Sequence, residues 1–525
     1  MTHTSPSNWI EKVRSALEGQ GRRPVIDYLQ RQRWFGGKGK PLTDVRLLDA
    51  FELSTGVEPC LVGVLLVEYR GGDQERYMVP LSVGRKVETD NATAIAECPA
   101  PSELQWVRDA TREDEVWQSL HEIVAMGREV LGEAGSLQGR TMAGRADDFA
   151  APVKAVKVLS SEQSNTSVVF DKRVIMKLIR KVEMGLNPDS EVLEFLTTKT
   201  ECGVVPPLLG VMTYRESHAE EAIEGTVGVV QQFVPNKGDG WSHVLARLDE
   251  LLGKMRGRAW EPGDALSKTV RSVSKAFIEE IRHLGLITGN LHVALASRSE
   301  PGPFQPEPIT VQDVERWQWK MSQFLMEVCR DLRVMSVDQQ AAVGISRAEA
   351  DALETACRDR FGDLMLLARA QTAKVRHHGD YHLGQVLKTD DGFVVIDFEG
   401  EPARPLEERR AKVCPLKDVA GMLRSFDYAA QALLKRDQSA SETDVAVVRA
   451  WEVAARETFL EGYRSVARPG QVLFLPAAWA DAMRILRVYE IDKALYELRY
   501  ELRNRPDWLS IPLQGIRRLV RERAA

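Results

Sequence analysis

The chain of 525 residues has few cysteines, no long apolar run and no excess of positive charge. Its six cysteines form no C-x-x-C pair, which excludes a zinc ribbon and a small disulfide scaffold. The longest apolar runs, such as 204–211, contain prolines and are too short to cross a bilayer. With 70 Lys+Arg against 76 Asp+Glu, the net charge of −6 lacks the basic footprint of a nucleic-acid-binding protein. We therefore expect neither a membrane nor a nucleic-acid partner.

The first residues, MTHTSPSN, have neither the basic nor the apolar region of a secretory signal. Together with the sparse cysteines, this leads us to expect a cytoplasmic protein. Hydrophobic residues make up 44% and charged residues 28%, which is ordinary globular composition. The length predicts about two to four folding units.

The order of predicted elements changes along the chain from strands to helices. The first hundred residues predict a helix at 9–17 and strands at 46–53, 60–69 and 76–81. Apolar spacing at 103–135 predicts helices, and the small, charged stretch 139–148 is the best linker candidate. A second strand-rich block follows, with strands expected at 153–159, 167–170, 174–179, 204–214 and 226–234. Its one helix is predicted at 189–199, where Asp189 either caps the helix or places charge near its N-terminus.

From Asp239 onward the pattern is mainly helical, with one strand-rich island at 375–397. The predicted helices are 241–255, 267–296, 309–332, 347–371, 419–434, 442–463, 478–503 and 515–523. A strand-rich block with one helix is thus followed by a helical block with one strand-rich island. This order of elements is the layout of a two-lobed kinase.

The strand island contains the sharpest chemical signal, H-G-D-Y-H-L-G-Q at 378–385 followed by V-V-I-D-F-E at 394–399. Phosphoryl transfer needs a carboxylate to orient the acceptor hydroxyl, together with oxygen ligands for Mg²⁺. Asp380 fits the catalytic base. Gln385, five residues later, and Asp397, after a short strand, fit the two metal ligands. Taken singly, the H-G-D motif is equally explained as a turn, and the I-D-F-E motif as the end of a surface strand. Taken together at their separation in the sequence, the two motifs favour a phosphotransferase.

The upstream strands contain groups suited to a nucleotide. Lys177 lies in the middle of a predicted strand, where a buried ammonium requires an anionic partner. Glu191 in the following helix is the predicted partner, as in the lysine–glutamate pair of kinases. The polar stretch 161–167 could cover phosphates, although it has no glycine and is in isolation equally an ordinary hairpin turn. Its candidate contacts are Ser164, Asn165, Thr166 and Ser167, and the strand end at Gln232 and Val234 is the candidate adenine hinge.

Other chemistries fit the sequence less well. His378 and His382 are four residues apart on a strand–turn segment without H-E-x-x-H, which argues against zinc. There is no G-x-S-x-G hydrolase motif. The aromatic and basic loop 34–40 is compatible with phosphate or nucleic-acid contact, and equally with a packed tryptophan beside solvated lysines.

These motifs resemble those of bacterial maltokinases, relatives of the aminoglycoside phosphotransferases in the eukaryotic-kinase-like superfamily. H-G-D occurs across small-molecule kinases, whereas R-Q-R-W-F-G-G-K-G-K at 31–40 and Y-E-I-D-K-A-L-Y-E at 489–497 are more specific. Further matching stretches are 162–170, 185–191, 239–241, 378–386, 397–405, 418–429 and 489–508. The resemblance implies an α+β, bilobal protein-kinase-like fold with an N-terminal cap subdomain and a large, mainly helical C-terminal lobe. The expected domains are a cap at 1–100, an intermediate subdomain with the nucleotide-binding lobe at 101–235, and the helical lobe at 236–525.

The resemblance also implies an activity and a set of site residues. Maltokinases use ATP and Mg²⁺ to phosphorylate maltose, giving maltose 1-phosphate for α-glucan synthesis. The implied base is Asp380, the metal ligands are Gln385 and Asp397, and Lys177 with Glu191 anchors phosphate. The implied sugar contacts are His378, Asp380, Tyr489, Asp492, Lys493 and Tyr496. Four of these lie on one face of the C-terminal helix at i, i+3, i+4 and i+7, a spacing equally compatible with core tyrosines and a solvated ion pair.

Two alternatives remain open beside a maltokinase. One is a kinase of the same fold for glucosamine or an aminoglycoside, which Lys493 on the sugar-facing helix disfavours. The other is a kinase-like binding module without turnover, although the base, metal and lysine positions are all present. Some relatives dock a trehalose-processing enzyme, so trehalose synthase is the expected partner protein, and the chain is expected to be a monomer or homodimer. Extra length at 103–148 and 249–263 distinguishes this sequence from a lone maltokinase.

Overall fold

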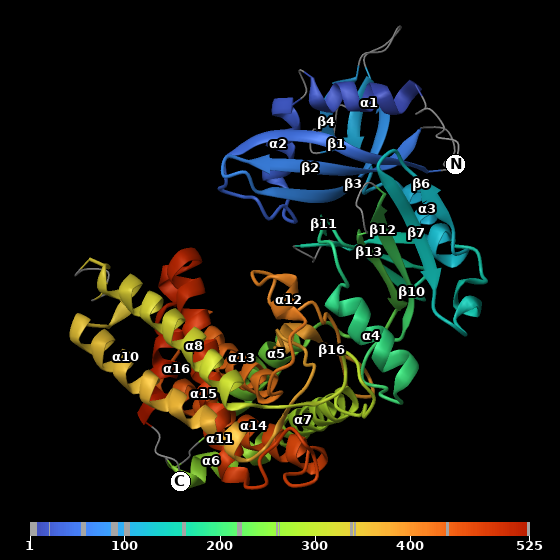
Figure 1. Ribbon diagram of the computed structural model, residues 1–525. Helices are drawn as coiled ribbons and strands as arrows, with labels where there is room; N and C mark the ends of the chain where they lie inside the picture. The colour runs from blue at the N-terminus through green and yellow to red at the C-terminus, as the bar shows by residue number, and fades with distance from the viewer. Residues whose placement is uncertain are drawn as a thin grey trace. The chain divides into compact units, whose positions relative to one another are not determined.

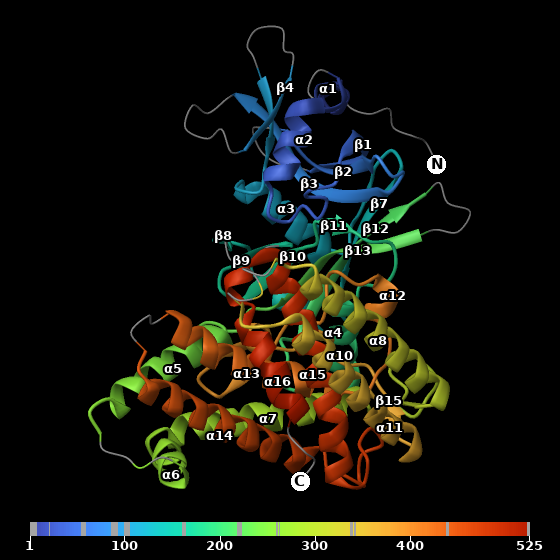
Figure 2. The same ribbon diagram turned by 90° about the vertical axis from the view of Figure 1, so that its left-hand side faces the viewer.

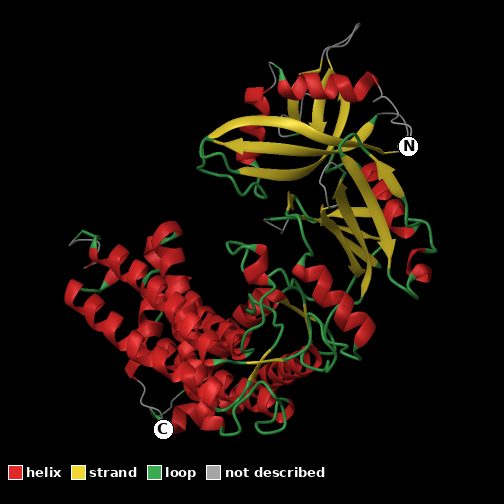
Figure 3. Ribbon diagram, in the orientation of Figure 1, coloured by secondary structure: helices red, strands yellow, loops and turns green. Residues whose placement is uncertain are grey.

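The computed structural model divides the chain into two compact units. The first comprises Met1–Thr197 and Pro206–Pro235, and the second comprises Thr198–Val205 and Asn236–Ala525. The structure describes residues 8–19, 22–53, 59–85, 93–98, 105–159, 164–217, 223–258, 261, 263–336, 340, 343–436 and 440–521. Strands are concentrated in the first unit and helices in the second (Figures 1 and 3).

The first unit begins with a six-stranded antiparallel sheet, the cap sheet. Its strands are β1 (Leu42–Leu53), β2 (Cys60–Tyr69), β3 (Gln74–Arg85), β4 (Ala94–Cys98) and β5 (Gln105–Asp109), in the order β1-β2-β3-β5-β4, with β11 (Lys181–Val182) paired to β3. Helices α1 (Asn8–Glu18) and α2 (Arg22–Arg31) contact β1 and β4. Strand β2 is apolar on both faces because each face meets a different core. Leu61 and Leu65 pack toward the two helices, whereas Val62 and Val64 pack toward the second sheet.

The second sheet has seven antiparallel strands in the order β6-β7-β12-β13-β10-β9-β8. The strands are β6 (Glu129–Leu131), β7 (Gly135–Thr141), β8 (Val156–Val158), β9 (Thr166–Phe170), β10 (Val174–Leu178), β12 (Leu208–Glu216) and β13 (Ile223–Gln232). Helix α3 (Asp114–Ala125) packs on β7 and β12, a 3₁₀ turn η1 spans Ala146–Phe149, and α4 (Pro188–Lys199) follows β11.

The predictions for 103–135 and 139–148 were wrong in part, because strands β5 and β6 lie within the first stretch and β7 extends into the second. Residues 105–109, expected in a helix, form strand β5 and pair with β3, because Val107 lies in the cap core. The expected linker 139–148 begins inside β7, whose residues pair with β12 in the middle of the sheet. Gly139 fits there because a side chain would collide with the backbone oxygen of Ile123 on α3. Glycines and charges that resemble a linker therefore mark a close strand–helix contact.

The second unit is a helical assembly that carries short strands. Its helices are α5 (Gly240–Met255), α6 (Asp264–Val273), α7 (Lys275–Leu295), α8 (Val311–Arg333), α10 (Arg347–Phe361), α11 (Met365–Arg369), α12 (Leu406–Arg409), α13 (Leu416–Arg436), α14 (Glu442–Val466), α15 (Trp479–Asn504) and α16 (Ser510–Arg521). Single 3₁₀ turns are η2 (Gly362–Leu364), η3 (Leu383–Gln385) and η4 (Pro506–Trp508). The strands are β14 (Glu307–Pro308) with β15 (Ala373–Lys374), and β16 (Val386–Lys388) with β17 (Phe393–Val395).

The predicted helices of this unit are present, but the periodicity did not show that two of them are divided. The expected helix 347–371 consists of α10, η2 and α11. The expected helix 267–296 is two helices, α6 and α7, separated at Ser274. Helix α7 packs against α14, and the two run side by side in both views (Figures 1 and 2). Gly285 and Gly462 allow this close approach, since a side chain at either position would collide with backbone of the opposite helix. Among the described residues, no helix is long and apolar enough to cross a membrane.

Candidate active site

The H-G-D segment lies between β15 and η3 and is held by a buried carboxylate. Asp418, on the first turn of α13, accepts hydrogen bonds from the backbone N–H of His378 (2.7 Å) and of Gly379 (3.0 Å). The nitrogen Nε2 of His292 lies 3.2 Å from the same carboxylate. Burial alone would raise the pKa of Asp418, but His377 and His292 hold it well below its usual range. Asp418 therefore fixes the catalytic loop as a charged, buried anchor.

Asp380 follows this anchored turn and carries its side chain into a cavity of the second unit. Its Oδ1 accepts a hydrogen bond from Lys493 Nζ at 2.9 Å. Burial alone would lower the pKa of Lys493, but Asp380 and Glu401 raise it above its usual range. Lys493 is thus a permanent cation that holds one oxygen of the proposed base.

His382 lies on the other side of Asp380, with Nε2 3.8 Å from Oδ2. Its Nδ1 accepts a hydrogen bond from the backbone of Gly384 at 3.0 Å, so the neutral ring carries its proton on Nε2. Burial lowers the pKa of His382, which favours that neutral form. Oδ2 of Asp380 has no closer side-chain partner among the residues described, so it is the less engaged of the two carboxylate oxygens.

The cavity that contains Asp380 has a volume of about 330 Å³, within the usual range for a small-molecule site. One wall is α15, which contributes four of the predicted sugar contacts. The α15 residues that line it are Tyr489, Asp492, Lys493 and Tyr496. The structure therefore brings these four side chains and Asp380 around one space, which their spacing on the helix face alone left open.

Helix α8 forms a second wall that the sequence prediction did not include. Its lining residues are Trp317, Trp319, Lys320, Met321, Gln323, Phe324 and Glu327. The stretch W-Q-W-K-M-S-Q-F was identified only as helical. Its aromatic residues could have suggested a ligand, because Trp319 keeps 62% of its surface exposed.

The floor also contains charged residues from the loop after β17 and from α13. Glu401, Arg404, Glu408 and Lys417 line the cavity, and none was predicted as a site residue. Glu401 and Arg404 nevertheless belong to the matching stretch 397–405. Burial raises the pKa of Asp492 on the opposite wall. The cavity thus offers alternating acidic and basic groups between aromatic surfaces.

Two predicted sugar contacts have distinctive surroundings. The hydroxyl of Tyr489 is buried and has no hydrogen-bond partner, so a ligand hydroxyl in the cavity could satisfy it. His378, by contrast, is 1% exposed and is not among the lining residues. Its Nε2 lies 3.0 Å from the carbonyl oxygen of Ile396, and its ring packs on Phe398. His378 supports the loop in this structure instead of facing the cavity.

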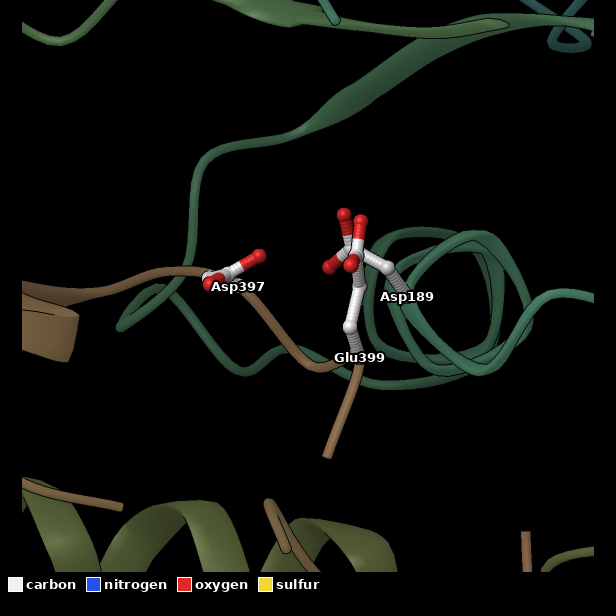
Figure 4. Close-up of side chains that lie close together, drawn as sticks. All are labelled: Asp189, Asp397 and Glu399. Carbon is white, nitrogen blue, oxygen red and sulfur yellow. The ribbon is translucent and has the colours of Figure 1, made fainter. Parts of the chain in front are cut away.

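The two predicted metal ligands are neighbours. Gln385 Nε2 donates to Asp397 Oδ2 at 2.8 Å, and the backbone N–H of Ile396 donates to the carbonyl of Gln385. Asp397 has a φ of 69°, a left-handed conformation that costs about 1–2 kcal/mol for a residue with a side chain. Glu399 follows two residues later on the same loop, as Figure 4 shows. Local strain at the end of β17 thus places an oxygen-rich segment beside Gln385.

In the first unit, the strand lysine has a carboxylate partner. Lys177 Nζ on β10 lies 3.7 Å from Asp189 Oδ2, and Asp189 is 1% exposed. Asp189 lies on the first turn of α4 (Figure 4), two residues before the predicted partner Glu191. The cap of α4 is Asn187, whose side-chain oxygen accepts from the N–H groups of Asp189 and Ser190. Of the two roles expected for Asp189, the structure therefore supports the charge near the helix N-terminus.

The structure describes part of the polar loop and all of the predicted hinge. Residues 160–163 lie outside the described residues, whereas Ser164 to Ser167 lead into β9. Ser167 pairs with Lys177 in register and shares its face of the sheet, but Thr166 faces the opposite side and accepts from Arg180 Nε at 2.9 Å. Thr166 is thus directed away from the predicted phosphate side. At the hinge, the N–H of Gln232 donates to Pro207 and that of Phe233 to Arg173, so those two donors are already bonded.

The carboxylate of Glu401, which lines the cavity, should make the stability of the folded protein depend on pH in the acid range. Burial alone would raise its pKa, but Lys417, Lys493 and Arg404 lower it to about 2. Because the folded pKa lies below the unfolded value of 4.5, its stabilisation is present above about pH 4.5 and is lost as pH falls toward 2. We expect Glu401→Gln to lower the unfolding free energy by about 2 kcal/mol at pH 7 and less below pH 4.

Urea unfolding at several pH values measures this effect. Glu300→Gln, a substitution of an exposed residue in a loop, is the matched control and should follow wild type throughout. A loss of stability that does not shrink toward low pH would contradict the role assigned to the ionised carboxylate.

Comparisons with known proteins agree with this arrangement. Residues 28–113 match the family model of the maltokinase N-terminal cap domain. A glucosamine kinase from Streptacidiphilus jiangxiensis is 27% identical over 71% of this chain and 75% of its own length. One from Mycolicibacterium smegmatis is 25% identical over 69% of this chain and 79% of its own length.

Solved structures show the same fold over the whole chain. A glucosamine kinase in complex with glucosamine, ADP and inorganic phosphate is 24% identical, covers 98% of this chain and 100% of its own, and has a TM-score of 0.63. A structure of a glucosamine kinase in another crystal form is 23% identical, covers 98% of this chain and 100% of its own, and has a TM-score of 0.66. These similarities confirm the expected α+β kinase-like fold with an N-terminal cap and a helical C-terminal lobe. The chain thus combines a segment that matches the maltokinase N-terminal cap domain with the fold of the solved glucosamine kinases.

Proposed function

We propose that the chain is an ATP-dependent maltokinase that transfers a phosphoryl group to the anomeric hydroxyl of maltose, giving maltose 1-phosphate and ADP. The observation that carries this proposal is the 330 Å³ cavity, where Asp380 faces two helices lined with aromatic side chains. Aromatic surfaces beside polar groups suit a sugar, whose ring has an apolar face and a hydroxylated edge. The maltokinase cap domain at 28–113 supports the same assignment.

The acceptor hydroxyl would be oriented by Asp380. Lys493 occupies Oδ1, which leaves Oδ2 to accept the hydrogen bond of the sugar hydroxyl and then its proton. The backbone of this loop is fixed by Asp418, so the carboxylate is positioned before substrate binds. Asp380 would therefore contribute to catalysis mainly by orienting the acceptor hydroxyl.

The nucleotide phosphates would be bound by Lys177, with Asp189 holding the lysine in place. Ser164, Asn165 and Ser167 are the proposed polar contacts, and Val234 contributes backbone at the hinge. Gln385 and Asp397 fit Mg²⁺ because they supply only oxygen ligands, provided the Gln385 amide rotates to present its oxygen instead of Nε2. Bound Mg²⁺ would neutralise charge on the transferred phosphate.

The charges in the cavity favour a neutral disaccharide over an amino sugar. The carboxylates of Asp380 and Glu401 are already paired with Lys493, and Glu401 also pairs with Arg404. An ammonium group near the base would have to displace or approach Lys493. Hydroxyl groups can donate to the carboxylates and accept from the cations without that cost.

Glucosamine is the second candidate acceptor, because six carboxylates line the cavity against four cations and the matching relatives are glucosamine kinases. The six are Glu327, Asp380, Glu401, Glu408, Asp418 and Asp492, and the cations are Lys320, Arg404, Lys417 and Lys493. An ADP-release assay with maltose, glucosamine, glucose and a model aminoglycoside decides between them. We expect the highest kcat/KM with maltose, and a tenfold preference for glucosamine would overturn the maltokinase assignment.

Trp319 tests whether the aromatic wall binds the acceptor. Its exposed indole lies at the cavity, and stacking on a sugar ring is worth up to about 1.5 kcal/mol, or about tenfold in binding. Trp319→Ala should therefore raise the KM for maltose about tenfold with little change in kcat, and Trp319→Phe should restore most of it. Val334→Ala, at the exposed end of the same helix, is the control. An unchanged KM would remove Trp319 from the acceptor site.

A further inference from the structure

A buried arginine lies beside the helix that supplies the cation of the proposed base. Helices α13, α15 and α16 pack against one another in the second unit (Figure 1). Arg424 on α13 is 1% exposed, and arginine is almost never buried to this extent without partners. A side chain at Gly515 of α16 would collide with its Nη1 atom, so the guanidinium is closely packed from that side. The packing therefore leaves this group little freedom to move.

The guanidinium of Arg424 is shared between two carboxylates. Its Nη2 donates to Glu497 Oε2 at 2.6 Å and its Nε to the same oxygen at 3.2 Å, whereas its Nη1 donates to Asp427 Oδ2 at 2.6 Å. Asp427 also pairs with Arg518 of α16, at 2.7 Å from its Oδ1. Burial raises the pKa of Glu497, and among its neighbours Arg424 opposes that rise most strongly, followed by Lys493. Lys493 is therefore the cation to which Glu497 would turn if Arg424 were absent.

Glu497 and Lys493 are one turn apart on α15. Residues four apart on a helix share one face, so a lysine and a glutamate at this spacing attract each other. In the structure, however, Lys493 Nζ lies 2.9 Å from Asp380 Oδ1 and 3.7 Å from Glu401 Oε1. Burial lowers the pKa of Lys493, and three carboxylates raise it, namely Asp380, Glu401 and Glu497. Three carboxylates thus compete for one ammonium group, and Arg424 engages one of them.

We propose that Arg424 is a positioning residue of the kinase, which holds Glu497 and so keeps Lys493 on Asp380. Without the guanidinium, the largely buried carboxylate of Glu497 would lose its hydrogen-bonded cation, and pairing with Lys493 would satisfy it. Lys493 would then leave Oδ1 of Asp380, and the base would lose the contact that orients it. Misplacing a catalytic group by about 1 Å can lower a rate about 100-fold. This role rests on the proposed function of Asp380 as the base.

Arg424→Met removes the guanidinium and keeps an unbranched apolar side chain. With maltose, or with glucosamine if it is the better acceptor, we expect kcat for ADP release to fall about 10- to 100-fold while the KM for ATP is unchanged. Circular dichroism gives the folded fraction to which each kcat is normalised. Adding Glu497→Gln to Arg424→Met removes the competing carboxylate, so kcat should return to within about threefold of wild type. A merely structural role of Arg424 would give no such restoration in folded protein.

Arg505→Met is the matched control on the same helix. Arg505 also uses two nitrogens to bind a buried carboxylate of α15, that of Glu501, at 2.6 and 2.9 Å. Glu501 lies eight residues beyond Lys493, about 12 Å along the helix axis, so it is too far away to capture the ammonium group. Both kcat and KM should therefore stay at their wild-type values.

A crystal structure of Arg424→Met tests the same inference without turnover. Lys493 Nζ should lie within hydrogen-bond distance of Glu497 and no longer of Asp380. If Arg424→Met does not fold, Arg424→Lys takes its place, because lysine keeps a cation there but lacks the two-pronged geometry of the guanidinium. Its kcat should fall about threefold or more and should also be restored by Glu497→Gln.

Three outcomes overturn the role of Arg424: a wild-type kcat in its variants, no restoration by Glu497→Gln, or an unchanged contact between Lys493 and Asp380 in the crystal. Wild-type protein that releases no ADP with any acceptor would contradict the proposed function instead. The crystal structure would still decide whether Arg424 holds Lys493 in place, so the two failures are distinguishable.

Discussion

Asp380→Asn is expected to lower kcat by about three orders of magnitude while leaving the affinity for ATP close to wild type. A positioned general base contributes about 10²–10⁴-fold, and the amide cannot accept the sugar proton. The substitution keeps the size of the side chain, and the amide oxygen can still accept the hydrogen bond from Lys493. The fold of the loop should also survive, because Asp418 holds it through the backbone of His378 and Gly379.

Single-turnover and steady-state ADP release, with nucleotide binding measured separately, check this expectation. Asp391→Asn is the matched control, since it is the same change on an exposed turn of the neighbouring β16–β17 hairpin. Residual activity within tenfold of wild type would show that Asp380 is not the base. A simultaneous loss of nucleotide binding would instead indicate damage to the fold.

The helical lobe was predictable because its signals are local. Tyr489, Asp492, Lys493 and Tyr496 of α15 line one cavity, because residues at i, i+3, i+4 and i+7 share one face of a helix. Gln385 and Asp397 were predicted from spacing around a short strand, and the β16–β17 hairpin brings their side chains into contact. Where residues lie on one element or one hairpin, sequence distance determines spatial distance.

The remaining parts of the site depend on long-range packing. Trp319 reaches the cavity only because α8 packs against α15, a contact between segments more than 150 residues apart that no local pattern specifies. His378 belongs to the motif, yet its bond to Ile396 turns the ring away from the cavity. Residues 105–109 were misassigned because their apolar spacing suits a helix as well as a strand, and pairing with β3 decides the outcome.

Asp397→Asn is the second change with a large expected effect, and it separates metal binding from backbone conformation. Asn tolerates the left-handed φ of 69° at least as well as Asp, so the turn should be preserved. The neutral amide, however, removes one negative charge from the proposed oxygen ligands. Removing a residue that only hydrogen-bonds to a metal ligand lowers the metal affinity about 10- to 100-fold. Removing the negative charge of a ligand itself should lower the affinity at least as much.

We therefore expect the Mg²⁺ concentration for half-maximal activity to rise at least about tenfold in Asp397→Asn, with a lower kcat at saturating metal. Chelation by EDTA should abolish ADP release in wild type, and added Mg²⁺ should restore it. Asp171→Asn is the matched control, because Asp171 also has a positive φ, 50°, but lies in the β9–β10 turn and is not a proposed ligand. If both variants lose activity equally and neither is rescued by Mg²⁺, the effect is one of backbone strain, and Asp397 is not a metal ligand. If only Asp397→Asn responds to added Mg²⁺, the carboxylate acts through the metal, because the backbone has a positive φ at both positions.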